Sequence, residues 1–251
     1  MSPAEQHFNK GNEFLFTNDH ESAIKEYEAS IAADSTYWKA YYEIGGVSQL
    51  EGDFEKAMAC FNKTIALNPD YAMAYYSRAS LAEAQGNEKL YMKDIDKAIS
   101  LKKNFFVAIY ARASKVYSKG DYKSAINYYT EAIKQRPDFY IAYSMRGNSK
   151  YKSGDLQGAI SDYNEEIKLK PDHIMGYVNR AVVQGEAKNY TAALADINQA
   201  MNIDPRWSQA YIYRGLFHMK INRNDSACFD FIVAKKLGNP AAEQYLKEYC
   251  K

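Results

Sequence analysis

The sequence predicts an all-α fold: a superhelical α-α solenoid of helix-turn-helix repeats that ends in a C-terminal capping helix. Small and large apolar residues recur with a period of 34 residues along nearly the whole chain, which is typical of a repeat architecture. With only 6 Pro and 13 Gly in 251 residues, the composition also favours many regular elements over a loop-rich fold. Together these observations predict a single solenoid over residues 2–251.

Seven copies of the repeat align without an insertion, and they start at residues 4, 38, 72, 106, 140, 174 and 208. The eighth position of each copy is Gly or Ala, the twentieth is Ala in every copy but the third, and the twenty-fourth is large. Because small residues face large ones, we expect two helices to pack closely within each copy. Prolines close four of the copies, at Pro69, Pro137, Pro171 and Pro205.

Local signals place the helices within a copy. In the fourth copy, Ile109, Ala113 and Val116 recur at helical spacing until Gly120-Asp121 interrupts the pattern. A second helix, a short link and the next copy follow.

The two ends differ from the repeats. Ser2-Pro3-Ala4-Glu5 has the spacing of a capping box, so the first helix is expected to begin near Pro3. After the seventh copy, Gly238 ends a helix, and a capping helix is expected over about residues 240–250. Its apolar stripe consists of Ala241, Tyr245, Leu246 and Tyr249.

These offsets resemble those of the tetratricopeptide repeat family, whose helix-turn-helix unit has Gly or Ala, Ala, aromatic residues and Pro at corresponding positions. The resemblance covers nearly the whole chain. It implies that the first helices of the copies line a concave groove. The third copy departs from the pattern, because Tyr91 replaces the packing alanine and Lys103 replaces the proline. We expect looser packing there.

Composition and motifs exclude several functions. The formal net charge of +1 gives no field that would gather nucleic acid. No window is apolar enough for membrane insertion. The four histidines lie in separate segments, and no catalytic, phosphate-binding or metal-binding motif is present. We therefore expect no enzyme, no cofactor and no metal.

The three cysteines, Cys60, Cys228 and Cys250, are an odd number with no CxxC motif. They are interpreted as free thiols used for packing. That interpretation favours a reducing compartment and a cytoplasmic protein, whereas removal of a leader would indicate an exported or periplasmic one.

Two polar rows repeat along the chain. Arginine recurs at the seventh position of copies three to seven, and aspartate recurs at the twenty-third position of four copies. We expect these rows to form ion pairs between helices rather than an anion site, because a guanidinium suits a fixed planar partner. Tyrosines at the fourth position, such as Tyr143, are expected in the core.

The groove implied by the resemblance is expected to be aromatic and aliphatic. Tyrosines at the fifth position and aliphatic residues at the second form two ladders. Tyr and Met suit peptide capture because they offer large contact areas. The family's carboxylate clamp is absent from the first copies, and copies five and six supply only its asparagines. The predicted partner-binding residues are Tyr42, Tyr76, Tyr110, Met73, Val107, Ile141, Met175, Asn148 and Asn179.

We therefore expect a non-catalytic protein–protein interaction module that binds a partner peptide or segment in this groove. The ladders would instead be core if neighbouring helices bury them against each other. The alternative function is an assembly scaffold that acts through its convex or terminal faces, as a homo-oligomer or as a component of a larger complex.

Overall fold

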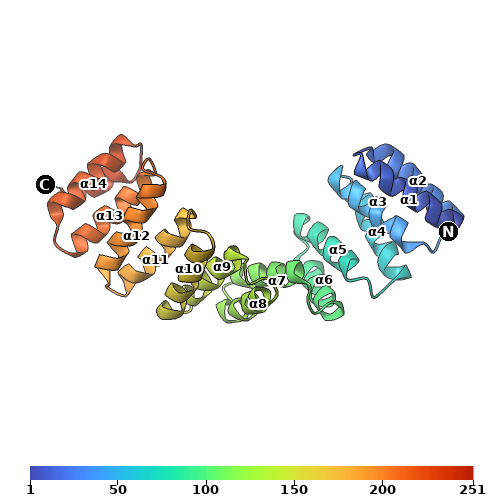
Figure 1. Cartoon of the computed structure of the whole chain (residues 1–251), viewed down its shortest axis with the longest axis horizontal. Helices are drawn as coiled ribbons and strands as arrows, with labels where there is room; N and C mark the ends of the chain where they lie inside the picture. The colour runs from blue at the N-terminus through green and yellow to red at the C-terminus, as the bar shows by residue number, and fades with distance from the viewer. Residues whose placement is uncertain (251) are drawn as a thin grey trace. The chain divides into compact units, whose positions relative to one another are not determined.

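A computed structural model describes residues 1–250, and over this range the chain contains fifteen helices and no strand (Figure 1). The predicted all-α helical-repeat solenoid is confirmed. The helices are α1 (Pro3–Phe16), α2 (His20–Ala33), α3 (Trp38–Leu50), α4 (Phe54–Leu67), α5 (Ala72–Ala84), α6 (Glu88–Leu101), α7 (Phe106–Ser118), α8 (Tyr122–Gln135), α9 (Tyr140–Lys152), α10 (Leu156–Leu169), α11 (Ile174–Glu186), α12 (Tyr190–Ile203), α13 (Ser208–Lys220), α14 (Asn224–Lys236) and α15 (Ala242–Tyr249).

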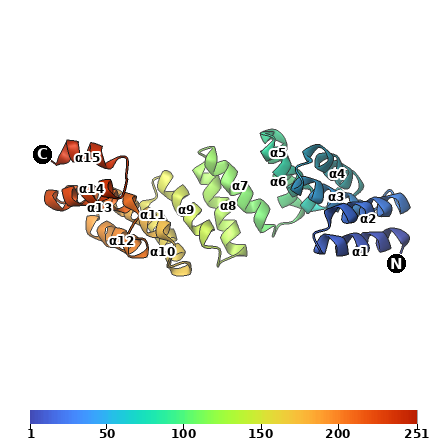
Figure 2. The same ribbon diagram turned by 90° about the horizontal axis from the view of Figure 1, so that it is seen from above.

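The chain forms two compact units, Met1–Arg112 and Ala113–Lys251. In the first, α1 to α4 pack in chain order and α5 packs on both α4 and α6. In the second, each helix from α8 to α15 packs on the next, as the helix pairs in Figure 2 show. First helices of neighbouring repeats also touch, α3 with α5 and α9 with α11. Each unit therefore stacks helix pairs so that one pair covers the apolar face of the next.

The helix starts agree with the sequence signals. The first helices of copies two to seven begin at residues 38, 72, 106, 140, 174 and 208. Helix α1 begins at Pro3, and the Oγ atom of Ser2 accepts a hydrogen bond of 3.2 Å from the Glu5 amide. This side chain satisfies one of the amides that a helix start leaves unpaired.

Small and large residues interlock as predicted. Gly147 on α9 faces the ring of Tyr163 on α10, and a Cβ atom at residue 147 would lie only 2.8 Å from that ring. Ala159 and Tyr163 are both almost completely buried. Close approach of the two helices therefore requires a residue without a side chain at position 147.

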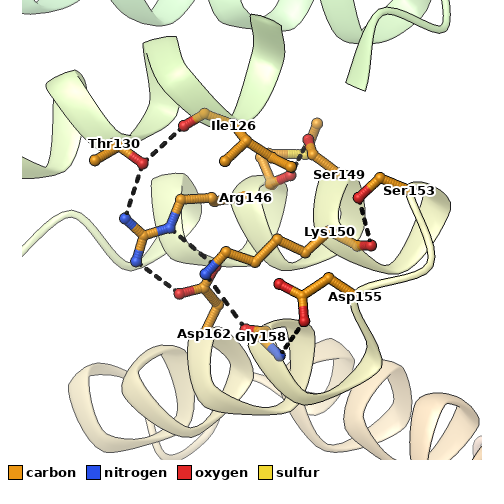
Figure 3. Close-up of polar contacts among 10 residues, drawn as sticks. Ile126, Thr130, Arg146, Ser149, Lys150, Ser153, Asp155, Gly158 and Asp162 are labelled. Carbon is orange, nitrogen blue, oxygen red and sulfur yellow. Dashed lines mark hydrogen bonds and ion pairs between the residues drawn. The ribbon is translucent and has the colours of Figure 1, made fainter. Parts of the chain in front are cut away.

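The turn between α9 and α10 explains the Gly-Asp pair that interrupts copies two, four and five. Gly154 has φ of 90°, a conformation that strains residues with a side chain. Asp155 follows, and its carboxylate accepts a 2.9 Å hydrogen bond from the Gly158 amide at the start of α10 (Figure 3). The pair thus ends one helix and caps the next.

The third copy accommodates its tyrosine. Tyr91 is only 3% exposed, and its hydroxyl donates a 3.1 Å hydrogen bond to the carbonyl of Ala111 on α7. The larger side chain thus adds a polar contact between copies three and four, and the loosening expected at Tyr91 is not seen.

One expectation about the cysteines is wrong. Cys228 on α14 and Cys250 at the end of α15 form a disulfide bond, with Cα atoms 5.7 Å apart. Only Cys60 is a free thiol. The odd number of cysteines and the absence of a CxxC motif argued against a disulfide, but α15 folds back on α14 and brings Cys250 to Cys228.

Helix α15 acts as the predicted cap on the last repeat. Ala242 is fully buried, and the ring of Tyr245 stacks on that of Phe231 with centroids 5.2 Å apart. Leu246 packs against the same cluster. Tyr249, expected in the apolar stripe, is 40% exposed because it stacks on the outer side of Tyr245.

Candidate functional site

The arginine and aspartate rows form the predicted ion pairs between helices. Arg146 on α9 donates two hydrogen bonds to the carboxylate of Asp162 on α10, at 2.9 and 2.6 Å (Figure 3). Asp162 is 2% exposed, and Lys150 forms a second ion pair with it at 2.8 Å. Equivalent pairs are Arg78–Asp94, Arg180–Asp196 and Arg214–Asp230.

Each of these arginines has a third contact that the sequence analysis missed. The remaining nitrogen of Arg146 donates to Thr130 Oγ1 on α8, 3.1 Å away, as Figure 3 shows. Three helices therefore meet at one guanidinium. Residues in the same place as Thr130 are Asn62, Asn164 and Asn198. Arg112 has Tyr128 where the others have aspartate, and it pairs backward with Asp96 at 2.7 Å.

The tyrosines of the fourth position belong to the same scaffold. The guanidinium of Arg180 lies 5.8 Å above the ring centroid of Tyr177. The hydroxyl of Tyr177 donates to the carbonyl of Pro171 at 3.1 Å. Tyr75 and Tyr211 repeat both contacts. These rows are therefore occupied by internal contacts and are not available as an anion site.

The tyrosine ladder of the first unit is half-buried. Tyr42 packs edge-on against Tyr71, with ring centroids 5.0 Å apart, and shares a 3.3 Å hydrogen bond with Ser77. Tyr76 packs against Phe105 at 5.3 Å. Tyr110 stacks on Phe106 at 6.2 Å. Burial raises the pKa of Tyr42 and Tyr76. The ladder thus joins the helices and keeps a partly exposed side.

The aliphatic ladder is divided between the units. Met73 in the first unit and Ile141 in the second are half-buried, and Met73 packs on the core cluster around Phe105. Val107 is 41% exposed and Met175 is 43% exposed. Each of these two side chains is thus exposed apolar surface within its own unit.

A hollow in the second unit brings three predicted residues together. Asn148, Met175 and Asn179 line a cavity of about 220 Å³ between α9 and α11. The wall also contains aromatic residues of α7, α9 and α13 that were not among the predicted binding residues: Tyr117, Tyr151 and Tyr213.

The polar groups of this cavity are oriented. The hydroxyl of Tyr163 donates to Asn148 Oδ1 at 2.8 Å, and the amide nitrogen of Asn148 donates one weak hydrogen bond of 3.9 Å to Met145 Sδ, which leaves its second N–H unused. Burial raises the pKa of Tyr163, so its hydroxyl keeps its proton and remains a donor. Among residues 1–250, no group pairs with the Asn179 side chain in the same cavity.

A second hollow of about 410 Å³ continues along α11 and α13 and shares Val182 and Tyr213 with the first. Leu216 and Phe217 form its apolar floor, and Lys220 stands at its edge. Tyr151, at the twelfth position of its copy, donates a 3.2 Å hydrogen bond to Glu186, at the thirteenth position of the next copy. Burial raises the pKa of Tyr151, and this hydrogen bond raises it further. The sequence could have indicated these residues because they occupy inner positions of the repeat. It could not give their contacts, which depend on how the neighbouring repeats pack.

Within residues 1–250, no group of three His, Cys, Asp or Glu side chains is arranged to hold a metal ion. Over the same part of the chain, each helix is too short or too polar to span a bilayer.

Two family models described as tetratricopeptide repeat match the sequence, one over residues 4–37 and 39–71, the other over residues 110–174 and 144–210. Among curated proteins, none matches the sequence.

Solved structures share the fold at low sequence identity. The C-terminal part of a TPR repeat-containing protein from Cytophaga hutchinsonii has a TM-score of 0.79 and 16% identity, with 95% of this chain and 99% of that chain covered. A tetratricopeptide repeat protein from Parabacteroides merdae has a TM-score of 0.63 and 17% identity, with 99% of both chains covered. YrrB, "a TPR protein with an unusual peptide-binding site", has a TM-score of 0.67 and 20% identity, with 73% of this chain and 95% of that chain covered.

Proposed function

Because the chain belongs to the tetratricopeptide repeat family, whose fold is a general protein–protein interaction module, we propose that it binds an extended segment of a partner protein in the groove of its second unit. The groove consists of the two hollows along α9, α11 and α13. It recognises the segment without catalysing a reaction.

The observation that carries this proposal is the pair of asparagines in one cavity. Asn148 has its oxygen engaged by Tyr163 and one amide N–H directed at the sulfur of Met145, 3.9 Å away, so its other N–H can donate to a partner. Asn179 offers both a donor and an acceptor. An extended backbone carries alternating carbonyl and amide groups, which such side chains pair with. Met175, partly exposed beside them, adds adaptable apolar contact.

The adjoining hollow supports an extended rather than compact ligand. Leu216 and Phe217 in its lining accept an apolar side chain. Its charged lining residues are Glu186, Lys188 and Lys220, and this excess of one positive charge favours an acidic or neutral flank. YrrB, similar in fold, is described as having a peptide-binding site.

The test is selection of a phage-displayed peptide library on the whole protein, followed by fluorescence anisotropy with a synthesised, enriched peptide. Asn179→Ala should weaken binding at least about fivefold, since it removes hydrogen bonds that the peptide would make. Asn127→Ala, on the exposed face of α8, is the matched control and should change nothing. Equal binding by wild type and Asn179→Ala, or failure to enrich any peptide, contradicts the proposal.

The scaffold alternative has one observation in its favour. Phe229 and Ile232 on α14 are 62% and 44% exposed, and Phe229 lines a hollow with Arg214 and His218. Size-exclusion chromatography with light scattering distinguishes the two functions. A stable oligomer that Phe229→Ser dissociates, combined with no peptide binding, would favour the scaffold.

We further propose that the protein works in an oxidising compartment, because disulfides persist in exported and periplasmic proteins and are rare in the cytoplasm. The Cys228–Cys250 bond supports this proposal. Thiol counting on denatured protein from its native cell should find one free thiol, Cys60. Three free thiols would favour the cytoplasm instead.

A further inference from the structure

Glu43 occupies, in the first unit, the repeat position that Asn179 occupies in the second. Both residues are the sixth of their copy. Each unit also contains the same neighbouring hydrogen bond, which in the first unit runs from the hydroxyl of Tyr27 to Asn12 Oδ1 at 2.8 Å. The asparagine of the second unit lines a cavity. The tyrosine–asparagine hydrogen bond thus occurs in both units, and the sixth residue of the next copy is a carboxylate in the first unit and an amide in the second.

The Glu43 carboxylate has no partner of its own. It is half-buried, and among residues 1–250 no group donates a hydrogen bond to it or forms an ion pair with it. Burial raises the pKa of Glu43. Lys39, a cation on the same helix, lies over the ring of Trp38 at 5.8 Å. Withdrawing an unpaired carboxylate from water costs free energy, which a cation from outside would offset.

Glu43 belongs to the same inner face as a cluster of aromatic rings. Burial raises the pKa of Tyr27, Tyr42 and Tyr71, and the charge of Glu43 adds to the rise at each of them. Tyr42, beside Glu43 in the sequence, packs on Tyr71 with ring centroids 5.0 Å apart. Tyr71 also packs against Trp38 at 4.5 Å. The faces of aromatic rings attract cations, and a carboxylate beside them can form an ion pair. Together these groups suit a positively charged side chain.

The inner positions of the first helices carry opposite net charge in the two units. On the inner positions of α1, α3 and α5, the charged residues are Glu5, Lys39, Glu43 and Glu83. On those of α9, α11 and α13 they are Lys152, Glu186 and Lys220. The first unit therefore favours a basic ligand, and the second does not.

We propose that the first unit holds a second recognition site, in which Glu43 pairs with an arginine or lysine side chain of a partner protein and the rings of Tyr42 and Tyr71 pack along that side chain. This site does not rest on peptide binding by the second unit. It takes a side chain with a cationic end, and the tyrosines supply the apolar contact for its stem.

The test is an NMR titration of the whole protein with a capped alanine peptide that carries one central arginine. A peptide with citrulline, the neutral isostere, in that place controls for charge. We expect shifts at the amides around Glu43 and Tyr71 with the arginine peptide, and binding at least about tenfold weaker with citrulline.

Glu43→Gln keeps the shape and removes the charge, and it should weaken arginine-peptide binding by a similar factor. Glu55→Gln, exposed on α4, is the matched control for loss of one negative charge and should leave binding unchanged. Equal affinity for both peptides, no shifts near Glu43, or full binding by Glu43→Gln would each overturn the proposal. Because these readouts lie in residues 1–112, they are independent of the Asn179 test.

Discussion

Glu166 on α10 lies against Gly176 on α11, with its carboxyl carbon 3.2 Å from the place where a Cβ atom of residue 176 would stand, and Cγ1 of the neighbouring Ile167 is 3.0 Å from the same place. Glu166 is fully buried, and its Oε1 atom is 2.7 Å from His173 Nδ1. Three other junctions have buried alanines at both equivalent positions: Ala98 and Ala108, Ala132 and Ala142, and Ala200 and Ala210. The large buried acid therefore depends on a glycine opposite it.

This dependence predicts a change of sign. Gly176→Ala should destabilise the wild type by about 1–2 kcal/mol, because Glu166 is held by His173 and has no room to move. In a Glu166→Ala background, the side chain of Ile167, whose Cγ1 lies 3.0 Å from the new Cβ position, can move into the space that the acid leaves, and the same change should stabilise the protein by up to about 1 kcal/mol through helix propensity. Urea denaturation of the four proteins completes the double-mutant cycle. Additive effects would show that Glu166 and Gly176 are not coupled.

The ion-pair rows predict an ordering of two arginine variants. Arg180→Ala leaves Asp196, which is 5% exposed, without a cation, whereas after Arg146→Ala the buried Asp162 keeps Lys150 at 2.8 Å. We expect about 3 kcal/mol lost for Arg180→Ala and about half of that for Arg146→Ala. Denaturation followed by circular dichroism measures both. The control is Arg206→Ala, at an exposed site, whose free energy of unfolding should stay within about 0.5 kcal/mol of the wild-type value. A larger loss for Arg146→Ala than for Arg180→Ala would contradict the argument.

The residues that the sequence predicts well are those whose partners lie in the same copy. Arg146 and Asp162 are sixteen residues apart, and a repeat fixes that distance in space. Thr130, which accepts the third hydrogen bond of Arg146, belongs to the preceding copy. The equivalent residue in other copies is Asn or Asp, so no single residue type indicates this contact in the sequence. The packing of Gly147 on Tyr163 was predictable for the same reason as the ion pair.

The candidate site was predicted in part. Asn148, Met175 and Asn179 come together because their positions share the inner face of α9 and α11. The role of Tyr213 depends on how α13 packs on the preceding repeat, which no spacing within one copy specifies. The disulfide was missed for a related reason, since the direction in which α15 returns to α14 is a tertiary feature.

The disulfide leads to a prediction about the C-terminal cap. Cys228 and Cys250 are 22 residues apart, and closing a loop of this size is worth about 3 kcal/mol. Reduction should lower the melting temperature and expose the α15 amides to hydrogen exchange before those of α13. Cys228→Ser should reproduce the effect without reductant, and Cys60→Ser should respond to reductant as the wild type does. Unchanged protection of α15 after reduction would mean that Tyr245 and Leu246 hold the cap alone.

Glu43 predicts an opposition between stability and binding. Its pKa is raised by burial, so the folded chain holds this proton more tightly than the unfolded chain, and stability falls as pH rises above the ordinary glutamate range. Above the raised pKa the carboxylate is ionised and destabilising, so Glu43→Gln should there stabilise the protein by about 1 kcal/mol. The gain should shrink as the pH is lowered through the raised pKa, because the wild type then becomes neutral too. The facing groups, Tyr27, Tyr42 and Tyr71, have pKa values raised above the ordinary tyrosine value and keep their protons over this range. Thermal melts of wild type, Glu43→Gln and the Glu55→Gln control from pH 4 to 8 measure the difference in stability. If Glu43→Gln is less stable than the wild type at pH 7, the carboxylate has an internal structural role instead.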